Sequence, residues 1–303
     1  MVTAPDEVPT EAVLAKAAHE NFPVAPRILP RAWRADLMAV YGFARLVDDI
    51  GDGDLAPGGA DAAALGVRGE GGEDRALLLD ALEKDLDRVF GHLGGGEPPR
   101  HPLLRALVPT VRRTGLEPGP FRGLIEANRL DQRVSRYADE EQLLSYCELS
   151  ANPVGRMVLT VTGTATPERV RRSDAVCTAL QLLEHLQDIA EDYRDRDRIY
   201  LPADDMRRFH VTAEDLAAPS ASASLRALVA FRTERARTLL DEGAPLVGSV
   251  RGRLRVLLAG FVGGGRATAR AIAGARYDVL AVAAGPTRTG LLREAGSALR
   301  RGA

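Results

Sequence analysis

Apolar residues recur every three or four positions along most of the chain, and Gly and Pro separate these segments. Such spacing indicates amphipathic helices, whereas the alternating β-branched runs that indicate strands are nearly absent. The sequence therefore predicts an all-α bundle. Helices are expected near residues 11–20, 32–52, 74–93, 102–114, 119–133, 139–164, 168–194, 223–242, 245–262 and 265–284.

Residues 11–285 are predicted to form one helical domain, and three other segments flank or interrupt it. Residues 51–73 are rich in Gly, Ala and Asp and predict a flexible loop. Residues 1–10 are predicted to be disordered. Residues 286–303 predict a tail that is loose, docked, or a basic amphipathic helix with peripheral membrane contact. The residues that would meet a membrane are Leu291, Leu292, Ala295, Leu299, Arg288, Arg293, Arg300 and Arg301.

Composition narrows the class of protein. The 303 residues are 45% hydrophobic and can bury a large core, and no block of like charge predicts nucleic-acid binding. Cys147 and Cys177 are too few for a disulfide scaffold or a zinc site, which predicts reduced thiols and a cytoplasmic protein. The N-terminus lacks the apolar core of a signal peptide. The longest apolar runs, such as VLAVAA at 279–284, are far shorter than the ~20 residues of a membrane span.

The stretch LVDDIGD, residues 46–52, places three carboxylates in an otherwise apolar helical segment. Asp48 and Asp52 are four positions apart and share a helix face, while Asp49 points about 100° away. Like charges at this spacing repel each other and weaken a helix by a few tenths of a kcal/mol. This cost suggests a functional reason for the cluster.

A second acidic helix is predicted from QLLEHLQDIAEDYRDRDRIYLP, residues 181–202. Glu184, Asp188 and Asp192 fall at i, i+4 and i+8, so the three carboxylates drift only about 40° per step and line one stripe. Leu182 and Leu186 lie beside that stripe, which favours an inward-facing position over a solvated acidic face.

Clustered carboxylates that face inward require cations, because an unpaired buried charge is costly. Ligands that offer only oxygen select hard ions, and Mg²⁺ commonly uses one or two carboxylates together with waters and substrate phosphates. A di-iron bundle would need Glu-x-x-His pairs, and none of the five histidines follows a Glu by three residues.

A metal between two acidic helices leaves room for a diphosphate, and Arg residues stand nearby. Arg45 precedes Asp48 by three residues, and Arg198 follows the second acidic motif. Neither GGADAAALG nor FVGGGR is a Walker loop, since both lack the lysine and the preceding strand. These features favour a prenyl diphosphate whose phosphates are held by metal and Arg.

Several segments together resemble the squalene/phytoene synthase family. They are YGFARLVDDIGD at 41–52, SYCELSANPVGRMVL at 145–159, ALQLLEHLQDIAEDYRDRDRIYLP at 179–202 and GRATARAIAGARYDVL at 265–280. The resemblance covers roughly residues 17–283. It implies a single-domain isoprenoid synthase fold, an all-α bundle around a central cavity, and an Mg²⁺-dependent enzyme that accepts Mn²⁺ in its place.

The resemblance also implies roles for individual residues. The metal ligands would be Asp48, Asp52, Glu184, Asp188 and Asp192, with Asp49 completing or orienting their arrangement. The substrate-binding residues would be Arg45, Arg198, Phe22, Tyr41 and Gln187. The catalytic residues would be Asp48, Asp49, Asp52, Asp188, Asp192, Tyr41, Tyr200 and Asn152. The two tyrosines could face a carbocation, core packing being the alternative. Asn152 lies at an expected helix kink, where it could present its amide to water or diphosphate, or satisfy backbone groups.

Two segments, ENFPVAPRILP at 20–30 and SANPVG at 150–155, resemble a subgroup that acts on presqualene diphosphate in the hopanoid pathway. That reaction ionises the substrate, opens its cyclopropane ring and adds water, so NADPH is not expected. A partner enzyme would supply presqualene diphosphate. The alternatives are condensation of two allylic diphosphates to presqualene diphosphate, squalene or phytoene, and a non-catalytic helical lipid-binding or assembly protein.

The chain departs from the subgroup at two positions. Pro26 stands where Ser is usual, which removes a hydroxyl and a backbone donor. Glu184 stands where Asn is common, which adds a negative charge and leaves the number of bound Mg²⁺ ions open.

Overall fold

A computed structural model describes residues 25–69, 72, 74–282 and 285–301. In this part of the chain the regular elements are helical, and one isolated bridge joins Arg136 and Ile199. The all-α prediction is therefore confirmed. The helices are α2 (Arg31–Asp52), α3 (Ala60–Ala64), α4 (Arg75–His92), α5 (Pro102–Thr114), α6 (Pro118–Asp131), α7 (Glu140–Ser150), α8 (Asn152–Val161), α9 (Pro167–Gln187), α10 (Ile189–Arg196), α11 (Ala203–Arg208), α12 (Ala213–Leu216), α13 (Ala223–Gly243), α14 (Pro245–Ser249), α15 (Gly252–Gly274) and α16 (Arg288–Arg301).

Short polar side chains explain where several helices begin. Asp74, Asp139 and Ser222 precede α4, α7 and α13, and each accepts a hydrogen bond from the backbone N–H three residues later. Such caps satisfy donors that the first helical turn leaves without partners. The starts of these helices agree with the predicted starts to within one residue.

Packing divides the chain into two compact units, and each is described by itself. The first unit comprises the chain up to Arg133 together with Arg156–Ala165, and the second comprises Val134–Gly155 and the chain from Thr166 onward. The predicted helix at 11–20 and the disordered segment at 1–10 lie outside the described residues.

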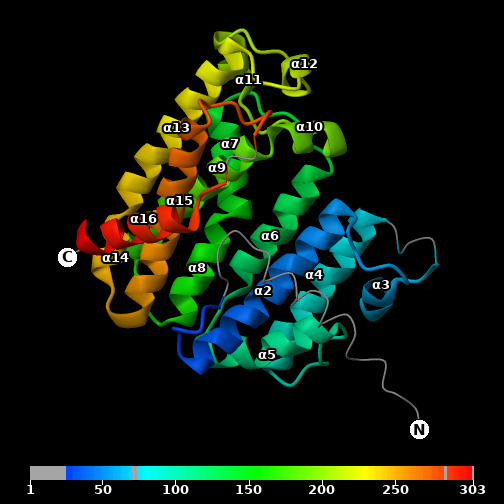
Figure 1. Ribbon diagram of the computed structural model, residues 1–303. Coiled ribbons are helices and arrows are strands. Elements are labelled where there is room, and N and C mark those ends of the chain that lie inside the picture. The colour runs from blue at the N-terminus through cyan, green and yellow to red at the C-terminus, as the bar shows by residue number, and fades with distance from the viewer. Residues whose placement is uncertain (1–24, 70–71, 73, 283–284, 302–303) are drawn as a thin grey trace. The chain divides into compact units, whose positions relative to one another are not determined.

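In the first unit, α2 packs against α4, α5 and α6 (Figure 1). Phe43 meets the edge of the Phe121 ring at a centroid distance of 5.1 Å, and Leu46 is fully buried. The buried Asp36 carboxylate accepts a hydrogen bond from Thr110 Oγ1 at 2.8 Å. These contacts fix α2, whose C-terminal end carries LVDDIGD.

The segment predicted to be a flexible loop, residues 51–73, contains the short helix α3. Asp61 of α3 is buried and contacts Nε2 of the buried His101 at 3.1 Å. Leu65 follows α3 and is only 4% exposed. Contacts with residues far along the chain thus order the middle of a segment whose composition alone predicts a loop.

In the second unit, α9 packs along α13, and α15 packs against both (Figure 1). The predicted helix at 139–164 is divided into α7 and α8 around Ala151, which confirms the kink expected beside Pro153. The predicted helix at 168–194 is also divided, because Asp188 leaves the helical conformation between α9 and α10. The helix expected at 265–284 instead continues the preceding one and ends at Gly274.

The C-terminal segment forms helix α16, which docks on α15 (Figure 1). A Cβ at Gly263 of α15 would lie 2.4 Å from the Ala295 nitrogen, so the two backbones approach closely only because Gly263 has no side chain. Arg270 pairs with the buried Glu294 at 2.5 Å. The described part of the tail is therefore a docked helix, and its contact with a membrane stays a prediction.

Candidate active site

The first acidic segment ends α2 and places its three carboxylates in different environments. Asp49 is buried, 3% exposed, and pairs with Arg45 one turn earlier at 2.8 Å. Asp48 is exposed and Asp52 is half-buried. The structure thus uses Asp49 to hold the Arg45 guanidinium, while solvent reaches the two carboxylates that share a face.

The pKa of Asp48 is raised to about 7. Surrounding protein atoms that displace water from the charged carboxylate are the main cause, and repulsion by Asp52 and Asp49 adds to it. A hydrogen bond from Asn128 Nδ2, 3.2 Å long, and the positive charge of Arg45 act in the opposite direction. Solvent still reaches the Asp48 side chain, so its oxygens are accessible to a cation.

Helices α4 and α6 hold the end of α2 in place. Gln132 Nε2 and Arg75 Nη1 donate to the carbonyl oxygen of Gly51 at 2.9 and 3.2 Å. Gly51 has no side chain, and a Cβ there would lie 1.8 Å from Asn128 Oδ1. The glycine of LVDDIGD therefore makes room for the amide that contacts Asp48.

The second acidic segment spans the junction of α9 and α10. Glu184 is exposed, whereas Asp188 and Asp192 are half-buried. Burial is the main cause that raises the pKa of Asp192 to about 7, and repulsion by Asp188 adds to it. The pKa of Asp188 is also raised, mainly by burial and then by repulsion from Glu191. Burial and repulsion thus disfavour the charged form of both carboxylates.

Two arginines lie close to Asp192. Arg196 Nη1 is 3.4 Å from Glu191 Oε1 and 3.9 Å from Asp192 Oδ1. Arg198 is buried, its backbone N–H donates to the Asp192 carbonyl at 2.9 Å, and its charge lowers the pKa of Asp192. Sequence reasoning named Arg198 and missed Arg196, which is one of many arginines on a charged helix.

Aromatic residues surround Tyr200 in the second unit. His185 stacks on the Tyr200 ring at a centroid distance of 3.9 Å and an interplanar angle of 8°. Tyr137 and Tyr146 lie 5.7 and 5.4 Å from the same ring. His185 therefore covers one face of Tyr200, and a direct contact between Tyr200 and a carbocation stays a prediction.

His185 is a buried histidine that the sequence-based site did not include. Its pKa is lowered to about 3, mainly by burial and also by the charge of Arg232, so the ring is neutral. Nε2 lies 3.0 Å from Gln181 Nε2, whose amide orientation sets which atom donates. Nδ1 is buried and has no hydrogen-bond partner among the described residues.

The remaining predicted site residues have different outcomes. Asn152 is buried at the start of α8, and its Oδ1 accepts from Thr178 Oγ1 at 3.0 Å, which ties α8 to α9. Tyr41 and Gln187 are half-buried on α2 and α9. Phe22 lies outside the described residues. Catalytic or substrate-binding roles for these four residues stay predictions.

The donor chemistry of both acidic segments fits Mg²⁺. Within the described part of the chain, no group of three or more His, Cys, Asp or Glu side chains is placed to hold a metal by itself. A Mg²⁺ ion that binds through one or two carboxylates and completes its shell with water and phosphate needs no such group. Burial is the main cause that raises the pKa of Asp48 and Asp192, and repulsion by neighbouring carboxylates adds to it. A bound cation would offset that repulsion.

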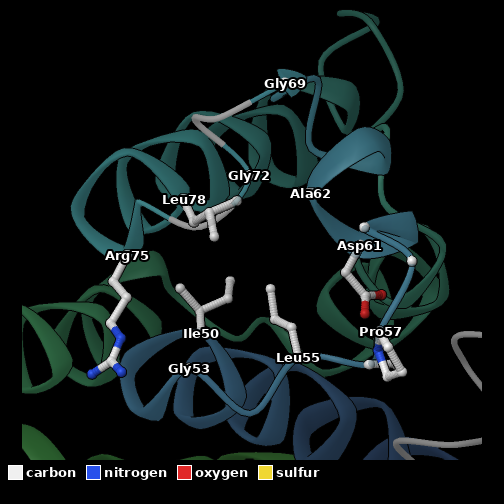
Figure 2. Close-up of a pocket in the computed structure, with 13 residues that line it drawn as sticks. Ile50, Gly53, Leu55, Pro57, Asp61, Ala62, Gly69, Gly72, Arg75 and Leu78 are labelled. Atoms are coloured by element: carbon white, nitrogen blue, oxygen red, sulfur yellow. The ribbon is translucent and has the colours of Figure 1, made fainter.

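A cavity of about 510 Å³ lies in the first unit between the end of α2, α3 and the start of α4 (Figure 2). Ile50, Leu55 and Leu78 line it, together with the Asp61 carboxylate. None of the predicted site residues is among its lining, and Asp61 is already engaged with His101. The cavity therefore borders the first acidic segment through the apolar Ile50 and is lined by none of the carboxylates predicted to bind metal.

Comparisons with known proteins agree with this description. The squalene/phytoene synthase family matches residues 15–293. The chain is 35% identical to a hydroxysqualene synthase from Rhodopseudomonas palustris over 77% of this chain and 72% of that one. It is 31% identical to a phytoene synthase from Mycobacterium tuberculosis over 78% and 72%. The crystal structure of squalene synthase HpnC from Alicyclobacillus acidocaldarius has 38% identity and a TM-score of 0.75, covering 89% of this chain and 94% of that one.

An all-α fold with two aspartate-rich helical segments defines an enzyme of the isoprenoid synthase class. Within that class, the chain belongs to the squalene/phytoene synthase family. None of the helices in the described part has the length and apolar character of a membrane span.

Proposed function

We propose that the protein is a hydroxysqualene synthase. It would ionise presqualene diphosphate, open the cyclopropane ring and let water capture the carbocation, giving hydroxysqualene and diphosphate. The observation that carries the proposal is the pair of crowded acidic segments, one at the end of α2 and one at the junction of α9 and α10, in each of which carboxylates repel one another. The named relatives and the segments ENFPVAPRILP and SANPVG support this choice of reaction.

The chain's own residues would act by binding and charge stabilisation. Mg²⁺, when bound, would neutralise the diphosphate as it leaves, and Mn²⁺ could replace it. Asp48, Asp52, Glu184, Asp188 and Asp192 would hold the metal. Arg45, which Asp49 fixes in position, and Arg198 would donate hydrogen bonds to the developing negative charge. No NADPH would be needed, because water rather than hydride quenches the cation.

The second candidate is a synthase that condenses two allylic diphosphates into presqualene diphosphate, squalene or phytoene. The 31% identity with a phytoene synthase favours it. Product identification separates the two candidates. Purified protein is supplied with presqualene diphosphate or with farnesyl diphosphate, each with Mg²⁺ and with or without NADPH.

We expect hydroxysqualene and diphosphate from presqualene diphosphate, with no change on adding NADPH. A presqualene diphosphate synthase partner would have to be added before farnesyl diphosphate is consumed. Efficient conversion of farnesyl diphosphate by the protein alone would instead establish the second candidate. No turnover of either diphosphate, with Mg²⁺ or Mn²⁺, would favour a non-catalytic lipid-binding or assembly role.

A further inference from the structure

We propose that His185 is a positioning residue that holds, through Nδ1, the water molecule that captures the carbocation. This inference rests on the proposed function, because only a water-quenched reaction needs such a molecule. Nothing in the sequence pattern singles out His185, which lies between Glu184 and Leu186 in a helical run.

The ring of His185 is held rigidly. It is 7% exposed, it stacks on Tyr200 at 3.9 Å, and the Tyr146 ring lies 6.1 Å away. The contact between Nε2 and Gln181, one turn earlier on α9, fixes the rotation of the imidazole. With stacking and one hydrogen bond both satisfied, the position of Nδ1 is set in advance.

Nδ1 is one of several buried side-chain atoms that have no hydrogen-bond partner among the described residues. It is buried, and no described residue forms a hydrogen bond with it. Buried polar atoms are nearly always paired with protein or with ordered water, because leaving one unpaired is costly. A neutral imidazole offers either an N–H or a lone pair at this position, and a water molecule can accept from the one or donate to the other.

His185 also lies beside the acidic stripe. It directly follows Glu184 near the end of α9 and precedes Asp188 by three positions. Tyr200, on which it stacks, follows Arg198 by two positions. A water at Nδ1 would therefore be held by a residue of the same short segment that carries the carboxylates proposed to bind metal. The alternative is a water molecule with a purely structural role. Arg232 Nη2 is also buried without a hydrogen-bond partner among the described residues, and the Arg232 charge acts on His185.

The chemical step balances without a further reactant. The C–O bond to diphosphate breaks and both electrons leave with the diphosphate. One C–C bond of the cyclopropane ring then breaks, and its electron pair forms a new C=C bond, which leaves an allylic carbocation. The water oxygen then forms a new C–O bond to the carbocation, and the resulting oxonium passes one proton to the diphosphate. His185 orients the water through this sequence and exchanges no proton in it.

Three substitutions at His185 test the proposal. His185→Asn keeps a polar atom near the Nδ1 position, His185→Gln keeps one near Nε2, and His185→Phe keeps only the stacked ring. The readouts are diphosphate released from presqualene diphosphate, hydroxysqualene formed per diphosphate, and melting temperature. His101→Gln is the matched control, because His101 is also buried and hydrogen-bonded but belongs to the first unit.

We expect His185→Phe and His185→Gln to lower hydroxysqualene per diphosphate by about five- to thirtyfold, with rearranged or elimination products in its place. Diphosphate release should stay within about fivefold of the wild type. His185→Asn should keep most of the wild-type ratio of hydroxysqualene to diphosphate. The control variant His101→Gln should change only the melting temperature. The proposal fails if the Gln and Asn variants give equal ratios, or if the wild-type ratio persists in all three variants. If the wild type releases no diphosphate from presqualene diphosphate, the proposed function fails and this inference with it.

Discussion

At the scale of single residues, Gly51 leaves the space that Asn128 occupies beside Asp48. The Asn128 amide donates to Asp48 at 3.2 Å, and a Cβ at Gly51 would overlap its oxygen. Gly51→Ala should therefore destabilise the protein by about 1–3 kcal/mol and lower turnover by about 10-fold to 100-fold, since Asn128 must move.

The matched control is Gly260→Ala on α15, where an added Cβ meets no atom within 4 Å. This variant should gain about 0.5–1 kcal/mol, because alanine favours the helix over glycine. Chemical denaturation and turnover measure both variants. Equal stability of the two alanine variants would show that the close approach of Asn128 to Gly51 does not contribute to the free energy of unfolding.

Glu184 offers a milder test at the same scale. It is exposed, whereas Asp188 and Asp192 are half-buried, and the resemblance places Asn at this position in many family members. Glu184→Asn removes one negative charge from a repelling set and keeps an oxygen ligand, so turnover should fall by less than about tenfold. Turnover measured against Mg²⁺ concentration checks this. A loss as large as that of Asp188→Asn would show that the Glu184 carboxylate is essential.

At the scale of elements, Asp278 ties the end of α15 to the start of α13. Its carboxylate accepts from the Ala221 backbone at 2.8 Å and pairs with Arg226 at 2.6 Å. The backbone hydrogen bond from Ala221 is the main cause that lowers the pKa of Asp278, and Arg226 contributes. A depressed native pKa stabilises the fold above the unfolded value of about 3.9, and this stabilisation is lost as the pH falls through the native pKa.

Asp278→Asn should lower the free energy of unfolding at pH 7 by about 1–2 kcal/mol. The difference between the variant and the wild type should narrow as the pH falls below about 3.9, where the unfolded-state carboxyl becomes protonated, and should be smallest below the native pKa, where the folded wild type is protonated as well. Urea unfolding of both proteins at pH 7, 5 and 3 measures how this difference in the free energy of unfolding changes with pH. A difference that widens toward acid would contradict the assigned interactions.

Helix α16 presents one broadly exposed apolar side chain. Leu292 is 75% exposed, whereas Glu294 and Ala298 are buried against the rest of the second unit. If the helix contacts membranes while docked, Leu292 and the neighbouring Arg293 are the residues that meet lipid. Leu292→Glu should weaken salt-sensitive binding to anionic vesicles several-fold, with the melting temperature unchanged. Equal vesicle sedimentation by both proteins would remove α16 from any membrane role.

At the scale of the whole molecule, helical spacing predicts most of the elements because it is a local property. The contacts that support the site and the breaks within helices do not depend on local spacing. Asn128 and Gln132 contact α2 from about 80 residues away, and Asp61 meets His101 across 40 residues. Asp188 interrupts a helix without Pro or Gly, so no composition signal marks it. The repeated spacing of the acidic residues makes them predictable from the sequence. Neutral residues that contact their helix, such as Asn128 and Gln132, follow no sequence pattern.

The proposed function requires the carboxylates of both acidic segments in the same step, the departure of the diphosphate. Asp48→Asn and Asp188→Asn should each lower turnover by about 10²–10³-fold, because each removes part of one electrostatic contact to the departing diphosphate. Without Mg²⁺, Asp48→Asn should melt at the wild-type temperature or slightly above it, since repulsion by Asp52 is relieved.

The most direct measurement is the turnover of presqualene diphosphate by the wild type, the two single variants and the double variant at saturating Mg²⁺. Residues that act as a unit give non-additive losses, so the double variant should lose far less than the product of the two single losses. Near-wild-type turnover by Asp48→Asn, or a double variant whose loss equals the full product of the two single losses, would contradict a joint role of the two segments in that step.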